Sequence, residues 1–358
     1  MARIRVLVVD DSVTVRKRLC DVLASDSAFD LVGEAGDGKR AIELCQHHRP
    51  NVVTMDMVLP VMSGLAATEY IMAYCPTPIL VVSASTNRGE LFTTYEALSA
   101  GAVDVLEKPN GTEADGIWER EFLGTLKLVS RIRVITHPRG RLSGLGLHAS
   151  PRSVAIVGNE GTARDFKIAV VGASTGGPAA ICEILRGLPA TFALPLLLVL
   201  HMNESFGIAF ADWLDAQSGR RVSHAKEGDL VAAAGGSVVM APSGSHLIVR
   251  GGRMHLSRDP ERHSCRPSVD VLFESIAREY GAGAVGCLLT GMGKDGASGL
   301  LEIRRAGGVT IAQDEKTSVV YGMPYEAVRI DAAARVLPLG EIARALATLG
   351  AASAGHTP

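Results

Sequence analysis

Short apolar runs alternate with amphipathic segments along the first 130 residues. Five runs of strand length are separated by segments whose apolar residues recur at helical spacing. Strands that alternate with helices predict a doubly wound parallel sheet covered by helices on both faces. The predicted strands are 4–9, 31–35, 52–57, 79–82 and 103–106, and the predicted helices are 12–25, 39–47, 65–74, 90–100 and a last one from about 116 past 128.

The same alternation resumes near residue 167 and predicts a second α/β domain with a parallel sheet. Two short runs flanking Gly251-Gly252, at 246–250 and 253–257, predict a β-hairpin. The remaining predicted strands are 168–171, 194–200, 238–239, 284–289 and 309–312, and the helices are 178–185, 209–217, 269–280 and 297–306.

The segment between the two regions has no sustained period. Residues 130–165 contain two prolines, several glycines and six arginines, which is typical of a linker, with one possible short strand at 154–157. The last residues predict a frayed tail. The expected division is a first domain at 1–125, a linker at 126–166, a second domain at 167–350 and a tail at 351–358.

Composition is consistent with two globular domains: the chain has 358 residues, 47% of them apolar, and a formal net charge of −2. The charge gives no reason to expect a nucleic-acid partner. The most apolar stretch, 192–200, is shorter than the roughly 20 residues that span a bilayer. The N-terminus lacks the features of a signal peptide. Six cysteines without a C-x-x-C pair indicate reduced thiols, so we expect a cytoplasmic protein without membrane insertion.

Charged residues gather at the predicted strand ends of the first domain. Asp10 and Asp11 end the first strand and Asp56 ends the third, while Ser83 and Lys108 end the fourth and fifth. Any one strand-end aspartate is typically a helix cap or a turn former. Three carboxylates on one rim repel each other, and a hard cation such as Mg²⁺ relieves this repulsion. Together the five positions predict aspartyl-phosphate chemistry.

A glycine-rich turn in the second domain presents a serine. Residues 172–178 read GASTGGP between an apolar strand and a helix, so Ser174 is expected near a helix N-terminus that favours developing negative charge. A dinucleotide-binding fingerprint would need glycine at the position of Ser174. The segment also differs from the G-x-S-x-G elbow of α/β-hydrolases.

Two further loops complete a possible triad. His201 ends the strand after the one that carries Ser174, and Asp295 lies in a glycine-rich turn at 290–296. The expected chemistry has His201 take the Ser174 proton while Asp295 orients the imidazole. The residues alone leave structural alternatives open: a packed histidine at a strand end, and an aspartate that caps the next helix.

Residues 1–125 resemble a response-regulator receiver domain, which implies a flavodoxin-like fold with five parallel strands. The resemblance implies phosphorylation of Asp56, with Mg²⁺ held by Asp56 and the two acids that end the first strand. It also implies that Ser83 supplies the switch hydroxyl and that Lys108 is the lysine of the receiver switch. One position departs from the pattern: Val105 stands where many receivers carry Tyr or Phe.

The second domain resembles the catalytic domain of the chemotaxis protein-glutamate methylesterase (CheB) family. This resemblance implies that Ser174 is the nucleophile, His201 the base and Asp295 the acid, and that the backbone N–H of Met292 holds the oxyanion. The matching segments are GASTGGP (172–178), HM (201–202), APSGSHL (241–247), CRPSVDVLF (265–273), LLTGMGKDGA (288–297), AGGVTIAQDE (306–315) and YGMP (321–324). The chain departs from the family at Asn203, usually Pro, and at Lys294, often Asn.

The two resemblances together imply a phosphorylation-activated serine hydrolase. It would remove methyl groups from glutamate methyl esters, and deamidate glutamines, on the cytoplasmic helices of chemoreceptors. A chemotaxis histidine kinase would be the phosphodonor, and the catalytic domain would need no cofactor. Three alternatives stay open: a paralogue that serves a non-chemotaxis receptor, a phospho-dependent adaptor with an inactive hydrolase domain, and a DNA-binding regulator. The absence of a helix-turn-helix signal or a basic helix disfavours the last.

Overall fold

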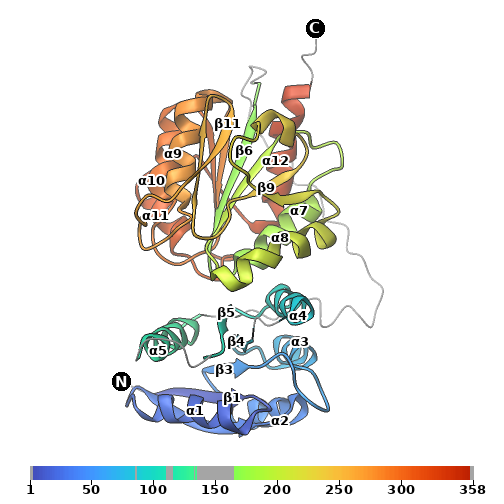
Figure 1. Cartoon of the computed structure of the whole chain (residues 1–358), viewed down its shortest axis with the longest axis vertical. Coiled ribbons are helices and arrows are strands. Elements are labelled where there is room, and N and C mark those ends of the chain that lie inside the picture. The colour runs from blue at the N-terminus through green and yellow to red at the C-terminus, as the bar shows by residue number, and fades with distance from the viewer. Residues whose placement is uncertain (1–2, 85–86, 110–115, 133, 135–164, 355–358) are drawn as a thin grey trace.

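The structure is a computed structural model that describes residues 3–84, 87–109, 116–132, 134 and 165–354. Two α/β domains lie end to end along the long axis of the molecule (Figure 1). The first contains the residues up to 134, and the second begins at 165. The strand suggested at 154–157 lies outside the described residues.

The first domain is the predicted doubly wound sheet. Its strand order is β2-β1-β3-β4-β5, and every neighbouring pair is parallel. The central strands are buried on both faces, as continuous apolar runs predict. The elements are β1 (Ile4–Val9), α1 (Val13–Ala24), β2 (Phe29–Ala35), α2 (Gly38–His48), β3 (Val52–Met55), α3 (Gly64–Tyr74), β4 (Ile79–Ser83), α4 (Arg88–Ser99), β5 (Asp104–Glu107) and α5 (Ile117–Val129).

The second domain is built on seven parallel strands in the order β14-β13-β12-β6-β7-β9-β8, with an antiparallel hairpin beside them. The strands are β6 (Ile168–Ala173), β7 (Leu196–Leu200), β8 (Val222–His224), β9 (Val238–Met240), β10 (His246–Arg250), β11 (Arg253–Ser257), β12 (Ala284–Leu288), β13 (Val309–Gln313) and β14 (Arg335–Leu337). The helices are α7 (Gly177–Gly187), α8 (Glu204–Ser218), η1 (Val231–Ala234), α9 (Val269–Tyr280), η2 (Gly281–Gly283), α10 (Ala297–Arg305), α11 (Met323–Arg329) and α12 (Leu339–Ala354).

Helices cover both faces of this second sheet (Figure 1). Helices α9, α10 and α11 lie over one face, and α7, α8 and α12 lie over the other. None of the helices in the described part of the chain is both long enough and apolar enough to cross a membrane.

The sequence pattern missed the shortest elements and shifted some boundaries. Strands β8 and β14 have three residues each and sit at the sheet edges, where few residues are buried, so they leave little periodic signal. Helix α8 begins at Glu204, five residues before its predicted start, and α11 and α12 were not predicted. Helix α12 continues to Ala354, into the predicted tail, and α5 continues to Val129, into the predicted linker.

The two domains meet where α4 of the first lies against α8 of the second. Tyr95 on α4 is fully buried, and its hydroxyl donates a hydrogen bond to the Phe206 backbone carbonyl. Its ring meets those of Phe210 and Trp213 at centroid distances of 5.2 and 5.5 Å. Apolar residues of both domains form one continuous buried cluster here. The interface is therefore packed like a domain core, with an aromatic centre in which the Tyr95 hydroxyl is hydrogen-bonded.

Candidate active site

Three loops meet at the carboxyl edge of the second sheet. Strands β12, β6 and β7 are neighbours in that sheet, with Gly172 paired to Leu288 and Ala173 to Leu200. Because parallel strands end at a common edge, the loops that follow them share one rim. Ser174 directly follows β6, His201 directly follows β7, and Asp295 lies in the loop after β12, so the predicted trio comes to one place.

The turn that presents Ser174 is held by backbone hydrogen bonds and by close packing. The Ser174 N–H donates to the Thr290 carbonyl at 3.0 Å, which ties the β6 and β12 loops together. Gly176 has a φ of 77°, in the left-handed region that favours glycine. A Cβ on Gly291 would lie 2.8 Å from the Ser174 Cβ, so only glycine fits against the nucleophile. Helix α7 starts at Gly177 and directs its N-terminal dipole toward this turn.

His201, which is partly buried, forms a pair with buried Asp295. Asp295 Oδ2 lies 2.9 Å from His201 Nε2. The carboxylate also accepts hydrogen bonds from the Ser268 hydroxyl at 2.8 Å and from the backbone N–H groups of Val269 and Asp270 at 2.7 and 3.1 Å. Burial alone would raise the pKa of Asp295, but these hydrogen bonds, led by that of His201, hold it below its usual value. Asp295 is therefore a fixed, ionised partner for the imidazole.

The pKa of His201 depends on its hydrogen bond with Asp295 and on a second contact, with Cys265. Burial alone would lower the pKa of His201, but hydrogen bonds with Asp295 and Cys265 outweigh it and raise the pKa to about 9. The imidazole is then protonated near pH 7 and becomes a free base as the pH rises. With Nε2 engaged by Asp295, Nδ1 is the nitrogen left for proton transfer. In this structure Nδ1 faces the Cys265 sulfur at 3.6 Å.

Ser174 lies at the same rim as His201, but the two side chains are not hydrogen-bonded to each other. Within the described residues, the Ser174 hydroxyl makes no hydrogen bond, to His201 or to any other group. Nucleophile-to-base contacts are often loose without substrate and tighten in the Michaelis complex. The Met292 backbone N–H is likewise uncommitted in the described part of the chain. The structure therefore brings the predicted residues together without showing a completed relay.

Two residues outside the predicted trio support Asp295. Ser268 caps α9 by accepting a hydrogen bond from the Val271 N–H, and its hydroxyl also donates to Asp295. Buried His246 accepts the Ser268 backbone N–H at Nδ1, at 3.1 Å. The capping signature was readable in the sequence. The contact with Asp295 was not, because it depends on the start of α9 facing the β12 loop.

Other polar side chains near the rim contact their own loops or face solvent. The Arg266 guanidinium donates to the backbone carbonyls of Arg258 and Asp259, so it stabilises its own loop. His263 Nε2 lies 3.1 Å from the Asp270 carboxylate. Lys294 lines a surface hollow of about 710 Å³ that also exposes His201 and Asp295.

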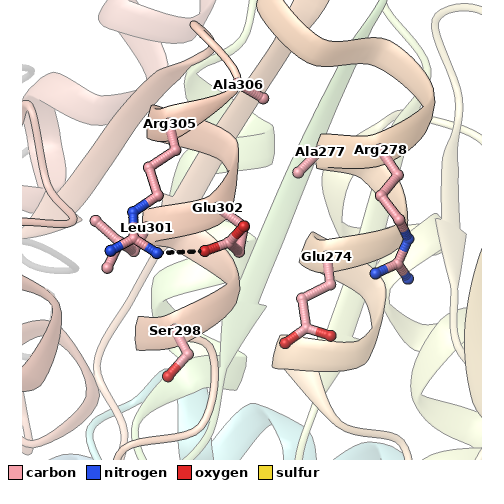
Figure 2. Close-up of a pocket in the computed structure, with 8 residues that line it drawn as sticks. All are labelled: Glu274, Ala277, Arg278, Ser298, Leu301, Glu302, Arg305 and Ala306. Carbon is pink, nitrogen blue, oxygen red and sulfur yellow. Dashed lines mark hydrogen bonds and ion pairs between the residues drawn. The ribbon is translucent and has the colours of Figure 1, made fainter.

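A second hollow, of about 660 Å³, lies on the outer side of helices α9 and α10 (Figure 2). Its side chains include Ser298 and the ion pair of Arg305 with Glu302, 2.8 Å apart. No histidine is among the residues that line it. This hollow therefore offers Ser298 no serine–histidine pair.

The first domain has its own polar site at the carboxyl edge of its sheet. Carboxylate oxygens of Asp10, Asp11 and Asp56 lie within 4.8 Å of one another. Lys108 Nζ lies 2.8 Å from both Asp10 and Asp56. Ser83 is buried at the end of β4, beside these acids in the sheet order. All five predicted positions therefore share one rim.

The electrostatics of this rim suit a hard cation. Burial, opposed by Lys108 and assisted by the charge of Asp10, raises the pKa of Asp56 to about 6. The three acids offer only oxygen ligands, which is the donor set that Mg²⁺ prefers. Val105, in place of the usual aromatic residue, is half-buried against the domain core.

Comparison with known proteins matches both domains. A sequence model described as CheB methylesterase matches residues 169–346, and one described as response regulator receiver domain matches residues 6–114. A protein-glutamate methylesterase/protein-glutamine glutaminase of Anaeromyxobacter dehalogenans is 43% identical over 346 residues, which cover 97% of each chain. The corresponding protein of Nitrosospira multiformis is 42% identical over 352 residues, also 97% of each chain.

Solved structures align with the two domains separately. The CheB methylesterase catalytic domain of Thermotoga maritima is 36% identical, with a TM-score of 0.49, and covers 51% of this chain and 98% of its own. The response regulator domain of CheB from the same organism is 36% identical, with a TM-score of 0.34, and covers 37% of this chain and 99% of its own.

Proposed function

This chain belongs to the CheB protein-glutamate methylesterase family, and we propose that it uses Ser174, His201 and Asp295 to hydrolyse glutamate methyl esters on chemoreceptors. The observation that carries the proposal is the partly buried His201–Asp295 pair, 2.9 Å apart, at the rim where the glycine-rich turn presents Ser174. A serine, a histidine and a carboxylate at one rim are the parts of a nucleophilic acyl-transfer site.

The chemistry follows from the placement of these groups. The Ser174 hydroxyl attacks the ester carbonyl while His201 Nδ1 takes its proton. The Met292 N–H and the N-terminus of α7 stabilise the oxyanion. The imidazolium then returns the proton to the leaving methoxide, which departs as methanol and leaves an acyl-enzyme. Water, deprotonated by His201, releases glutamate. With a glutamine substrate the same steps release ammonia.

The first domain supplies regulation. Asp56 is the phospho-acceptor in this proposal, and Asp10, Asp11 and Asp56, whose oxygens fit a hard cation, would hold Mg²⁺. When bound, the metal neutralises charge on the transferring phosphoryl group. Lys108 already bridges two of these acids and holds the phosphoryl oxygens, and Ser83 supplies the switch hydroxyl.

Contacts between the two domains support a coupling between the proposed switch and Ser174. The Thr175 hydroxyl, next to Ser174, donates to Asp104 Oδ2 at 3.0 Å, and the Ser205 hydroxyl donates to Glu107 Oε2 at 2.6 Å. Both acids belong to β5, the strand that leads to Lys108. A rearrangement at Lys108 would act directly on the loops after β6 and β7. Phosphorylation therefore shifts the population away from this closed arrangement.

The physiological partners follow from the same proposal. The substrates are glutamate and glutamine side chains on cytoplasmic helices of chemoreceptors, and a chemotaxis histidine kinase is the phosphodonor. The proposed division of the chain is a receiver at 1–125, a linker at 126–166, a catalytic domain at 167–350 and a tail at 351–358.

Methanol release from methylated chemoreceptor membranes tests the proposal. We expect release by the unmodified protein, faster with a small phosphodonor and Mg²⁺, and none by Ser174→Ala. Ser298→Ala is the matched control, because this serine lies in the hollow without a histidine. Release that persists in Ser174→Ala would overturn the assigned nucleophile. An unmodified protein that releases no methanol but still reacts with a phosphonate at Ser174 would indicate a paralogue with another substrate. One that does neither would indicate an adaptor.

A further inference from the structure

We infer that Cys265 and His201 form a binding site for a thiophilic divalent cation such as Zn²⁺, and that metal bound there inhibits the hydrolase. Binding itself depends only on the geometry described below. The inhibitory consequence rests on the proposed role of His201 as the base.

The distance between the two ligand atoms suits a shared metal. Cys265 Sγ lies 3.6 Å from His201 Nδ1. Zinc binds cysteine sulfur at about 2.3 Å and histidine nitrogen at about 2.1 Å, and a tetrahedral angle between these bonds separates sulfur from nitrogen by about 3.6 Å. The pair therefore needs little movement to accept the ion.

The carboxylate on the other ring nitrogen completes the usual surroundings of a metal-binding histidine. Asp295 engages His201 Nε2 and is itself fixed by Ser268 and two backbone N–H groups. Metal-bound histidines generally direct their second nitrogen to such a carboxylate, which sets the ring orientation and increases ligand basicity. Asp295 thus acts on the metal through the imidazole.

A tight backbone turn before Cys265 sets the position of its sulfur. Arg262 and Cys265 pair through two backbone hydrogen bonds, and the two residues between them, His263 and Ser264, have φ values of 53° and 60°. Two consecutive non-glycine residues in the left-handed region form a tight turn that side chains disfavour. This turn directs Cys265 toward the catalytic histidine.

The remaining coordination positions are open to solvent. The hollow of about 710 Å³ is lined by Cys265 and His201 and has room for water ligands. Two cations also line it. Arg329 is ion-paired with Glu326 at 2.8 Å, and Lys294 is exposed. Neither contacts the thiol–imidazole pair in the described structure.

A neighbouring cluster of His263, Asp270 and Asp295 is a poorer site. Arg262 already brings its positive charge to Asp270 at 3.6 Å, and the other Asp270 oxygen accepts the Gly299 N–H at 2.6 Å. Its ligands are therefore committed to protein partners. The Cys265–His201 pair is less committed, since the thiol's only other contact among the described residues is the His263 carbonyl at 3.4 Å.

Metal binding at this pair would stop the reaction because the metal would occupy the nitrogen lone pair that accepts the Ser174 proton. As the two metal bonds form, the Cys265 thiol loses its proton to solvent and so does the His201 imidazolium that is present near pH 7, so binding there releases two protons and strengthens as the pH rises. The lone pair on Nδ1 is then held by the metal and can no longer accept the Ser174 proton. Removal of the metal by a chelator restores the base.

Cobalt(II) absorption in the full-length protein tests the site without any substrate. A thiolate ligand gives a sulfur-to-cobalt charge-transfer band in the near ultraviolet, whereas cobalt held by the receiver carboxylates gives none. Excess Mg²⁺ occupies that oxygen site during the titration. We expect the band in the unmodified protein and in Cys20→Ser, and its loss in Cys265→Ser. Cys20 is the matched control, because it is the only other cysteine that is not buried.

Three further outcomes complete the test. His201→Ala should weaken cobalt binding at least about tenfold while Cys265 remains available. Zn²⁺ should protect Cys265, but not Cys20, from alkylation and should inhibit methanol release reversibly. A band that persists in Cys265→Ser, or no band in the unmodified protein, would overturn the site. Metal binding without inhibition would overturn only the proposed role of Nδ1.

Discussion

Asp295 Oδ2 lies 2.9 Å from His201 Nε2, and this contact leaves Nδ1 as the nitrogen that can exchange a proton with Ser174. Asp295 can hold that position because the start of α9 surrounds it with three hydrogen-bond donors. Asp295 therefore fixes the orientation of the His201 ring, whereas the Ser174 hydroxyl makes no hydrogen bond within the described residues. This division of roles leads to the first two predictions.

The activity should rise with pH over an unusually alkaline range. The base must be neutral to accept a proton, and its pKa is raised to about 9, so kcat/KM of the free enzyme should increase as the pH approaches that value. Cys265 contributes to the raised pKa, so Cys265→Ser should move the profile to lower pH when both proteins are assayed with a chelator. A profile already flat between pH 6 and 8 would contradict the assignment.

Removal of the Ser268 hydroxyl should lower both kcat and the free energy of unfolding. Ser268→Ala deletes both the α9 cap and the hydrogen bond to Asp295, costing about 1–2 kcal/mol of unfolding free energy and about 10–100-fold in kcat. Ser268→Thr retains the hydroxyl and should therefore retain most of the unfolding free energy and most of kcat. Ser275→Ala, on the same helix but without contact to Asp295, is the control: it should lower stability without moving the pH profile.

Weakening the domain interface should raise the activity of the unphosphorylated protein. Tyr95→Phe keeps the buried ring but removes the hydrogen bond to the Phe206 carbonyl, which is worth about 1 kcal/mol. That loss corresponds to about a fivefold shift away from the closed arrangement. Arg88→Ala should act more weakly, because its ion pair with Asp212 is exposed. Tyr70→Phe should leave activity unchanged, because this α3 hydroxyl accepts a hydrogen bond from Gln46 within the first domain.

Loss of Lys108 should separate stimulation from catalysis. Lys108→Ala removes the cation that bridges Asp10 and Asp56, so a phosphodonor should no longer increase methanol release, while basal release continues. Lys127→Ala, which removes a surface ion pair with Asp26 in the same domain, should retain stimulation. Full stimulation of Lys108→Ala would show that the switch does not depend on this lysine.

Strand ends could be predicted from the sequence because their signals are local. Apolar runs placed β1, β6 and β7 closely, and the polar residues that follow them, including Asp10, Ser174 and His201, then fell on common rims by the geometry of parallel sheets. Nothing local revealed that Cys265 faces His201, since 64 residues separate them and a left-handed turn makes the contact. The burial of Tyr95 against α8 depends on domain docking and was equally hidden.

The most direct test is the rate at which a fluorophosphonate labels the full-length protein, followed by mapping of the labelled residue. A phosphorylation-controlled serine hydrolase should be labelled at Ser174 alone, faster when a phosphodonor and Mg²⁺ are present, and not at all in His201→Gln at neutral pH. Labelling of another serine would contradict the assigned site. A labelling rate at Ser174 that a phosphodonor leaves unchanged would contradict its control by the first domain.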